Sequence, residues 1–246
     1  MAHLQLFLFG TPRIEREGVA VNVDTRKAVA LLAYLAVTRQ RHSRDALAAL
    51  LWPDYDQPHA RATLRRTLSA LNKALAGQCL DIDRETIGLD YRSGLWVDVD
   101  EFHNYIASCR SHHHAATESC QNCLEPLAKA AVLYAGDFMA GFNLIDSSKF
   151  DDWQFFQADT LRRELASMLE RLVYCLSATA NFEAAISYGR RWLSLDRLHE
   201  PAHRALMQLF AWSGQRTAAL HQYQECVQTL EEELGVAPFR GNNATV

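Results

Sequence analysis

The stretch DQPHARATLRRTLSALNKAL, residues 56–75, decides the fold. Asp56 can cap a helix and Pro58 suits its first turn. Leucines then recur at intervals of four, three and four residues, at Leu64, Leu68, Leu71 and Leu75. At 100° per residue the opposite face carries side chains that are small or basic: Ala62, Arg66, Ser69 and Lys73. The stretch therefore predicts a helix over residues 58–76 with one apolar and one cationic face.

Short β-like and helical segments surround this helix. Alternating apolar residues over 4–23 predict two or three antiparallel strands, and a helical pattern follows at 25–37. Ser43 can cap a second helix that Pro53 ends. After Gly77 come β-like pieces at 79–82, 86–89 and 95–97, which predict a hairpin wing at about 84–95. Three helices and a hairpin are the layout of a winged helix, whose third helix is the recognition helix.

Charge is distributed unevenly along the chain. The 246 residues carry a net charge of −4, which taken alone argues against a nucleic-acid binder. Residues 25–76, however, hold nine basic side chains against three acidic ones, or +6, whereas residues 99–246 hold 12 against 18, or −6. A basic module joined to an acidic one is typical of a polyanion-binding domain attached to another domain. Basic helix faces that are merely solvated are the alternative.

The basic residues of the winged helix supply the candidate DNA contacts. Arg41 and Arg44 flank the start of the second helix, where a phosphate could bind. Arg92 lies in the expected wing region, as does Arg84. The full set of DNA-binding candidates is Arg41, Arg44, Arg61, Arg65, Arg66, Ser69, Lys73 and Arg92.

From about residue 98 the chain reads as all-helical. Helices are expected at 98–108, 121–135, 150–178, 182–195, 200–213 and 215–234. The pair Ala184-Ala185 recurs 34 residues later as Ala218-Ala219, and 34 residues is the period of tetratricopeptide repeats. The sequence therefore predicts an α+β winged helix-turn-helix domain at 1–97, followed by an all-α tetratricopeptide-like domain at 98–246. Aromatic residues of the last helices could line a peptide groove or fill the core: Tyr188, Trp192, Phe210, Trp212 and Tyr223.

Cysteine and histidine cluster in residues 109–123. His112, His114, Cys120 and Cys123 could form a tetrahedral zinc site, with Cys109 as a substitute ligand. Such a site would be structural, and a polar loop with incidental cysteines is the alternative. The isolated cysteines at 79, 175 and 226 are expected to be buried.

Several segments resemble the SARP-type regulators, bacterial activators of antibiotic and other gene clusters. Those of the first half are RKAVALLAYLA (26–36), SRDAL (43–47), LWP (51–53) and ARATLRRTLSAL (60–71). Those of the second half are LYAGDFMAGF (133–142), Trp153 and LEEELGVAP (230–238). Ala70 and Asn72 stand where the family often has arginine, so no contact is carried over to them.

The resemblance implies an OmpR-like winged helix beside a bacterial transcriptional activator domain. It also implies an activator that binds double-stranded DNA, contacts RNA polymerase, and pairs head to tail as a homo-oligomer on direct repeats. Larger members continue into an ATPase domain, and no phosphate-binding G-x-x-x-x-G-K-[ST] occurs here. We therefore expect the N-terminal part of a longer regulator, with a naturally short two-domain activator as the alternative.

Other classes of protein fit less well. No catalytic motif is recognisable, so no enzyme is expected. No apolar run reaches the roughly 18 residues of a membrane span, and the start lacks a signal peptide, so we expect a cytoplasmic protein. The competing function is a non-enzymatic repeat scaffold that binds a partner and whose winged helix does not contact DNA.

Overall fold

The computed structural model describes residues 4–111 and 120–237, which divide into two units. The first unit holds residues 1–104 and 133–161, and the second holds residues 105–132 and 162–246. The helices α4 (Asp98–Arg110) and α6 (Ser148–Ala178) each contribute residues to both units, and α5 (Leu124–Leu133) contributes its last residue to the first. In this division by contacts, the segment 133–161 groups with the first unit.

The first unit begins with a four-stranded sheet in the order β3-β2-β1-β7. Its strands are β1 (Leu4–Phe7), β2 (Arg13–Arg16), β3 (Val19–Ala20) and β7 (Trp96–Val97). The first three are antiparallel, as expected, but β7 pairs with β1 in parallel. The sequence pattern had suggested that residues 95–97 belong near the wing hairpin. They pair with β1 and not with the hairpin. Their partner lies some 90 residues earlier in the chain, and local pattern does not reveal it.

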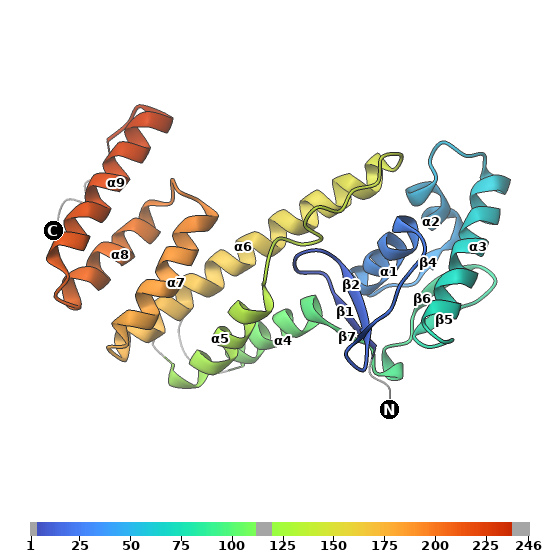
Figure 1. The fold of residues 1–246 in the computed structure, drawn as a ribbon, viewed down its shortest axis with the longest axis horizontal. Helices are drawn as coiled ribbons and strands as arrows, with labels where there is room; N and C mark the ends of the chain where they lie inside the picture. The colour runs from blue at the N-terminus through green and yellow to red at the C-terminus, as the bar shows by residue number, and fades with distance from the viewer. Residues whose placement is uncertain (1–3, 112–119, 238–246) are drawn as a thin grey trace. The chain divides into compact units, whose positions relative to one another are not determined.

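The helices and hairpin expected from the sequence are present (Figure 1). The helices are α1 (Arg26–Thr38), α2 (Arg44–Leu51) and α3 (Gln57–Ala74). A second sheet has the order β4-β6-β5, with β4 (His42–Ser43), β5 (Leu80–Ile82) and β6 (Thr86–Leu89). The β5–β6 hairpin is the wing. It is shorter than expected, since a 3-10 turn, η1 (Tyr91–Ser93), follows it.

Residues 133–161 complete the core of the first unit. Met139 N–H donates to the Leu8 carbonyl (2.7 Å), and Phe9 bridges Phe138. The ring of Trp153 lies 4.8 Å from that of Tyr34 on α1. These contacts bury Phe9, which follows β1, and cover part of Tyr34 on α1. The segment LYAGDFMAGF, with its resemblance to the second domain of the family, therefore packs in the unit that holds the winged helix.

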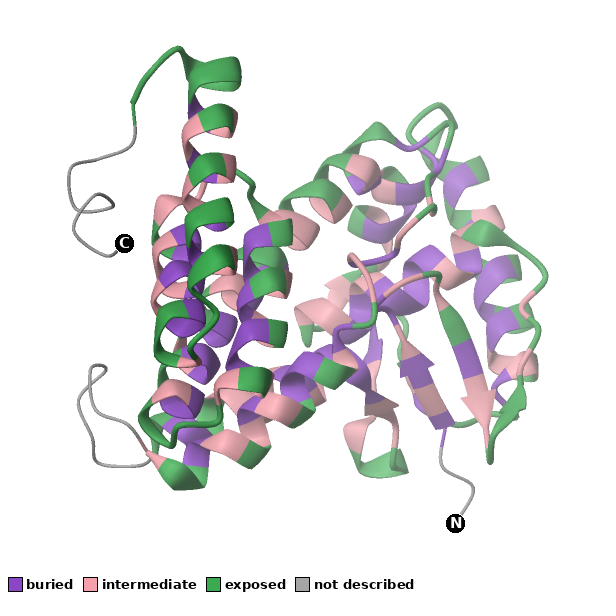
Figure 2. Ribbon diagram, turned by 60° about the vertical axis from the view of Figure 1, so that its left-hand side comes forward, coloured by how far each residue is buried: buried purple, intermediate pink, exposed green. Residues whose placement is uncertain are grey.

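The second unit is helical. It contains η2 (Gln121–Cys123), most of α5 (Leu124–Leu133), α7 (Phe182–Leu195), α8 (Glu200–Trp212) and α9 (Arg216–Leu234). Helices α7 and α9 begin 34 residues apart, in agreement with the repeat. Helix α7 approaches α8 closely at Gly189, where an added Cβ would stand 2.9 Å from Leu206 Cδ2. Figure 2 shows buried residues on the facing sides of the helices.

Buried positions agree with most expectations. Cys79, Cys175 and Cys226 are at most 3% exposed, as expected. Among the aromatics, Trp192 and Phe210 belong to the core, whereas Trp212 is 58% exposed. Within residues 4–111 and 120–237, none of the helices combines the length and the apolar character needed to cross a bilayer.

Candidate nucleic-acid interface

Helix α3 forms as its sequence predicts. The Asp56 carboxylate accepts a hydrogen bond from the His59 backbone N–H (2.9 Å) and so caps the helix. All four leucines of the stripe are at most 4% exposed, and Ala60 and Thr67 extend the buried face. Because this face packs on α1 and α2, the opposite face of α3 is presented to solvent.

The turn before α3 completes a helix-turn-helix pair. Ser43 Oγ accepts from the Ala46 N–H (3.1 Å) and caps α2, as expected. Between the helices, Trp52 is 5% exposed, and the backbone N–H of Tyr55 donates to its carbonyl (3.3 Å). A buried aromatic and a hydrogen-bonded turn set the angle between α2 and α3.

Most of the basic residues of the +6 segment are already engaged within the first unit. Arg26 donates to Asn143, and Lys27 pairs with Asp146 (2.7 Å). Arg39 pairs with Asp100 (3.2 Å). The other engaged members are Arg41, Arg44 and Arg61. Their hydrogen bonds and ion pairs hold the unit together, so their charge is partly neutralised by the chain itself.

Three basic residues of that segment remain: Arg65, Arg66 and Lys73. All three are exposed, and none has a side-chain hydrogen bond or ion pair with any residue that the structure describes. Ser69 is exposed on the same side of α3. Four of the eight candidate DNA contacts are therefore gathered on the outward face of one helix, free to meet an external anion.

Arg61 joins α3 to α2. Its guanidinium forms a two-pronged pair with the Asp45 carboxylate, in which Nη2 lies 2.6 Å from Oδ2. The arginine holds the pKa of Asp45 below its usual range by hydrogen bonding and charge, and the carboxylate raises the pKa of Arg61 in turn. Both side chains are about half exposed, so Arg61 is accessible to solvent but is already paired with Asp45.

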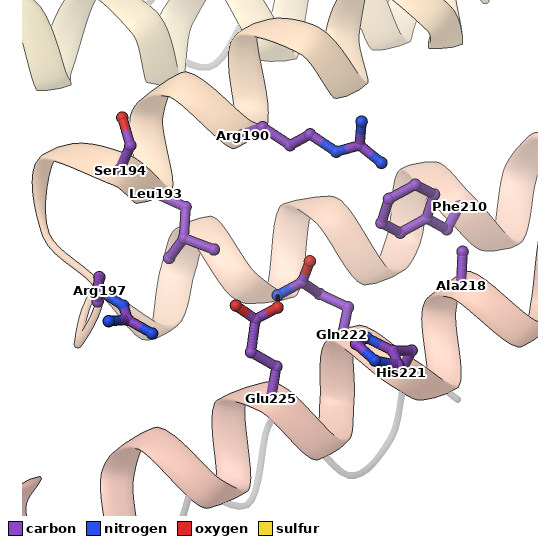
Figure 3. A pocket seen from close by; sticks show the side chains of 9 residues that line it. All are labelled: Arg190, Leu193, Ser194, Arg197, Phe210, Ala218, His221, Gln222 and Glu225. Atoms are coloured by element: carbon purple, nitrogen blue, oxygen red, sulfur yellow. Dashed lines mark hydrogen bonds between the residues drawn. The ribbon is translucent and has the colours of Figure 1, made fainter.

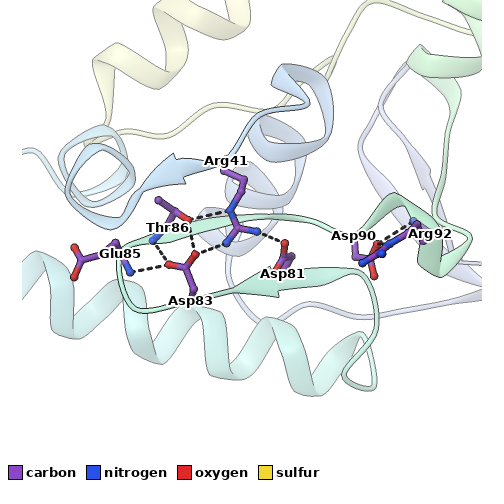
Figure 4. Close-up of polar contacts among 7 residues, drawn as sticks. All are labelled: Arg41, Asp81, Asp83, Glu85, Thr86, Asp90 and Arg92. Atoms are coloured by element: carbon purple, nitrogen blue, oxygen red, sulfur yellow. Dashed lines mark hydrogen bonds and ion pairs between the residues drawn. The ribbon is translucent and has the colours of Figure 1, made fainter.

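Arg41 and Arg44 brace the wing, and Figure 4 shows the contacts of Arg41. Arg41 pairs with Asp81 and with Asp83 (2.7 Å) and donates to Thr86 Oγ1 (3.0 Å). Arg44 Nη2 donates to the Asp83 carbonyl (2.8 Å). Asp83 also accepts from two backbone N–H groups of the turn, which lower its carboxyl pKa strongly. Arg41 and Arg44, which are expected to hold phosphate at the start of α2, thus also fix the hairpin turn.

Glycine at position 88 makes this bracing possible. A Cβ there would stand 3.0 Å from Arg41 Cγ, which is tighter than ordinary contact. The absent side chain lets the stem of Arg41 lie across strand β6 and reach both carboxylates of the hairpin.

Arg92 and Arg84 are placed differently from each other. Arg92 lies in η1, outside the hairpin, and pairs with Asp90 (3.0 Å), which lowers the pKa of that carboxyl (Figure 4). Arg84 lies in the turn between β5 and β6, is exposed, and has no hydrogen bond or ion pair with a described residue. The tip of the wing thus carries Arg84, which the candidate set omitted. Its place in a predicted turn was the available signal.

The expected metal site is only partly within the described residues. His112 and His114 lie outside them. The thiols of Cys109 and Cys120 both interact with Cys123, whose pKa is raised by burial and by these neighbours. Among residues 4–111 and 120–237, no group of three or more His, Cys, Asp or Glu side chains is arranged to hold a metal ion.

The chain matches a known protein family. The model of the bacterial transcriptional activator domain matches residues 97–242. The transcriptional regulatory protein EmbR of Mycobacterium bovis and that of Mycobacterium tuberculosis are each 25% identical over 248 residues, which cover 96% of this chain and 60% of theirs. The chain therefore spans about 60% of the length of these relatives.

A solved structure supports the fold. Mycobacterium tuberculosis EmbR, in complex with a low-affinity phosphopeptide, superposes with a TM-score of 0.78 at 21% identity, over 100% of this chain and 64% of that one. The expected order of a winged helix-turn-helix and a helical domain is confirmed. The relatives are transcriptional regulators rather than enzymes. The chain belongs to the bacterial transcriptional activator domain family, among regulators of the SARP type.

Proposed function

We propose that the chain is a sequence-specific, DNA-binding transcriptional activator whose helix α3 enters the major groove. The observation that carries the proposal is the outward face of α3, where Arg65, Arg66 and Lys73 are exposed and unpaired among the described residues. In this proposal residues 1–97 carry the DNA contacts. Residues 98–246 mediate self-association or relay a signal, and RNA polymerase is a further partner.

The chemistry of this face suits DNA. Ser69 and Ala70 are small, which lets the helix backbone approach the base edges. Guanidinium and ammonium groups reach phosphates, and arginine can also pair with a guanine edge. Arg84 at the wing tip is positioned to meet the adjacent backbone, while the braces from Arg41 and Arg44 hold the hairpin in place. Preorganisation of this kind lowers the entropy lost on binding.

Selection of bound sites from a random duplex pool tests the proposal directly. We expect an enriched sequence, and a direct repeat of it if two copies bind head to tail. Failure to enrich any sequence, with no duplex binding at low salt, would favour the competing function, a repeat scaffold whose winged helix does not bind DNA.

The double variant Arg65→Ala/Arg66→Ala tests the assigned face. Affinity for the selected duplex is expected to fall, and the slope of log affinity against log salt to flatten by about 0.9 for each phosphate that the variant no longer neutralises. Arg216→Ala removes an exposed arginine of the same type on α9 and serves as the control. Unchanged circular dichroism in all variants would show that the fold is intact and that the DNA-binding surface alone has changed. Equal DNA binding by the double variant and the control would contradict the assignment.

We also propose a structural zinc ion near Cys120 and Cys123. The proposed ligands are His112, His114, Cys120 and Cys123, with Cys109 as a substitute. The support is chemical, since thiolate and imidazole are ligands that zinc favours, and Cys123 interacts with both Cys109 and Cys120. Zinc would lower the pKa of these thiols and hold the start of α5. Metal analysis of protein purified without a histidine tag should find about one equivalent, which Cys123→Ser removes. Less than about a tenth of an equivalent in the parent chain would contradict the proposal.

A further inference from the structure

The helical unit contains a pocket that DNA binding does not use. Side chains from α7, α8 and α9 and from the α7–α8 turn line a volume of about 530 Å³ (Figure 3). Leu193, Phe210 and Ala218 form its apolar floor, and the first two are at most 9% exposed. The basic residues Arg190, Arg197 and His221 are exposed to solvent around it. The pocket is therefore an open groove of mixed character rather than an enclosed cavity.

A buried polar network fixes one wall of the groove. His203 is 2% exposed, and its two ring nitrogens bond the Arg197 carbonyl (3.0 Å) and the Gln222 amide nitrogen (2.9 Å). The same amide nitrogen donates to Glu225 Oε2 (3.0 Å). The network orients Gln222 and satisfies Glu225, whose carboxylate lines the pocket. The acid in the groove is thus already engaged by a neighbouring side chain.

The two arginines are not engaged in the same way. Neither Arg190 nor Arg197 has a side-chain hydrogen bond or ion pair with any described residue, although Arg190 lies 5.7 Å from the centroid of the Phe210 ring. They stand in a half of the chain that carries −6. Unpaired guanidinium groups in a groove of an otherwise acidic module indicate a binding site for an anionic group.

We propose that this groove binds an acidic peptide segment of a partner protein. The guanidinium groups receive its aspartate or glutamate side chains, and the surface of Leu193 and Phe210 receives an apolar residue between them. A small metabolite would normally be 70–90% buried in its pocket, which an open groove with an exposed basic rim does not provide. The inference goes beyond DNA binding and does not depend on it.

Display of random ten-residue peptides, with the whole chain as bait, tests the proposal. We expect enriched peptides that place aspartate or glutamate beside an apolar residue. A synthetic copy of one enriched peptide, labelled for fluorescence anisotropy, should bind at least tenfold more weakly after all its carboxylates are changed to amides. This comparison requires no change in the protein, so it is independent of any effect on folding.

Variants of the protein complete the test. Arg190→Ala/Arg197→Ala should lower the affinity for the peptide at least tenfold, whereas Arg216→Ala should change that affinity by less than twofold. Binding to the selected duplex should remain within twofold in all three proteins. The proposal fails if enriched peptides lack acidic residues, or if none is enriched. It also fails if the double variant binds the peptide as the parent does, or if it loses affinity for DNA instead.

Discussion

Removal of the Phe138 side chain should destabilise the winged helix although the residue lies 64 positions beyond α3. The ring is 2% exposed, lies 5.8 Å from that of Trp153, and its backbone bridges Phe9. Phe→Ala substitutions at buried sites typically cost about 3–5 kcal/mol of unfolding free energy. With a urea dependence of about 2 kcal/mol per M, the unfolding midpoint should fall by roughly 2 M.

The effect on DNA binding depends on the conditions. If the unit has a free energy of unfolding of about 8 kcal/mol, the variant keeps about 4 kcal/mol. About 99% or more of the variant then stays folded without denaturant. Affinity for DNA should then be unchanged in buffer but abolished at a lower urea concentration than in the parent chain. The assay is a urea titration that follows tryptophan fluorescence and retention of a labelled duplex in parallel samples.

Phe155→Ala is the matched control, because this phenylalanine on α6 is 69% exposed. Its removal should change stability by less than about 0.5 kcal/mol. The reasoning is refuted if Phe138→Ala behaves like the control. It is refuted equally if the fluorescence midpoint falls while DNA is retained to the parent's urea concentration, since residues 133–161 would then not belong to the cooperative unit of the winged helix.

Three further changes test the packing and the ion pairs. Arg61→Ala should weaken DNA binding less than Arg66→Ala, because Arg61 is occupied by Asp45; the reverse order in an anisotropy titration would contradict this. Gly189→Val should lower stability by about 1–3 kcal/mol through overpacking against Leu206, measured by urea unfolding. Burial raises the pKa of Asp98 to about 6, so its contribution to stability should fall as pH rises from about 4 to 6 and then level off. The measurement is the difference in unfolding free energy between the parent and Asp98→Asn, taken at pH 4.5 and at pH 7. The same difference at both pH values would contradict the prediction.

The pH prediction depends on the environment of Asp98. Its carboxylate accepts from the N–H groups of Leu8 (2.7 Å) and Phe9 (2.9 Å) and is 2% exposed. Burial outweighs these hydrogen bonds and raises the carboxyl pKa. The folded state therefore binds a proton more tightly than the unfolded state between the two pKa values, which gives the sign.

Elements whose formation depends on residues close together in the sequence were predictable. The leucine spacing, the Asp56 cap and Pro58 suffice for α3, and the cap at Ser43 suffices for α2. The pairing of strand β7 with β1 was not predicted, because it spans some 90 residues. The role of residues 133–161 was missed for the same reason, since the sequence pattern reports a segment's own structure and not the surface that it covers.

The sequence by itself determined the helix-turn-helix, its basic outward face and the helical character of the second half, since periodicity and capping act within a few residues. Only the tertiary structure decided which cations are available. Arg61 meets an aspartate 16 residues away, and Arg41 meets two that lie about 40 residues away. An ion pair depends on distance in space, so a count of charges along the chain treats Arg41, Arg61 and Arg66 alike. The fold separates the first two, which hold the domain together, from the third, which faces outward.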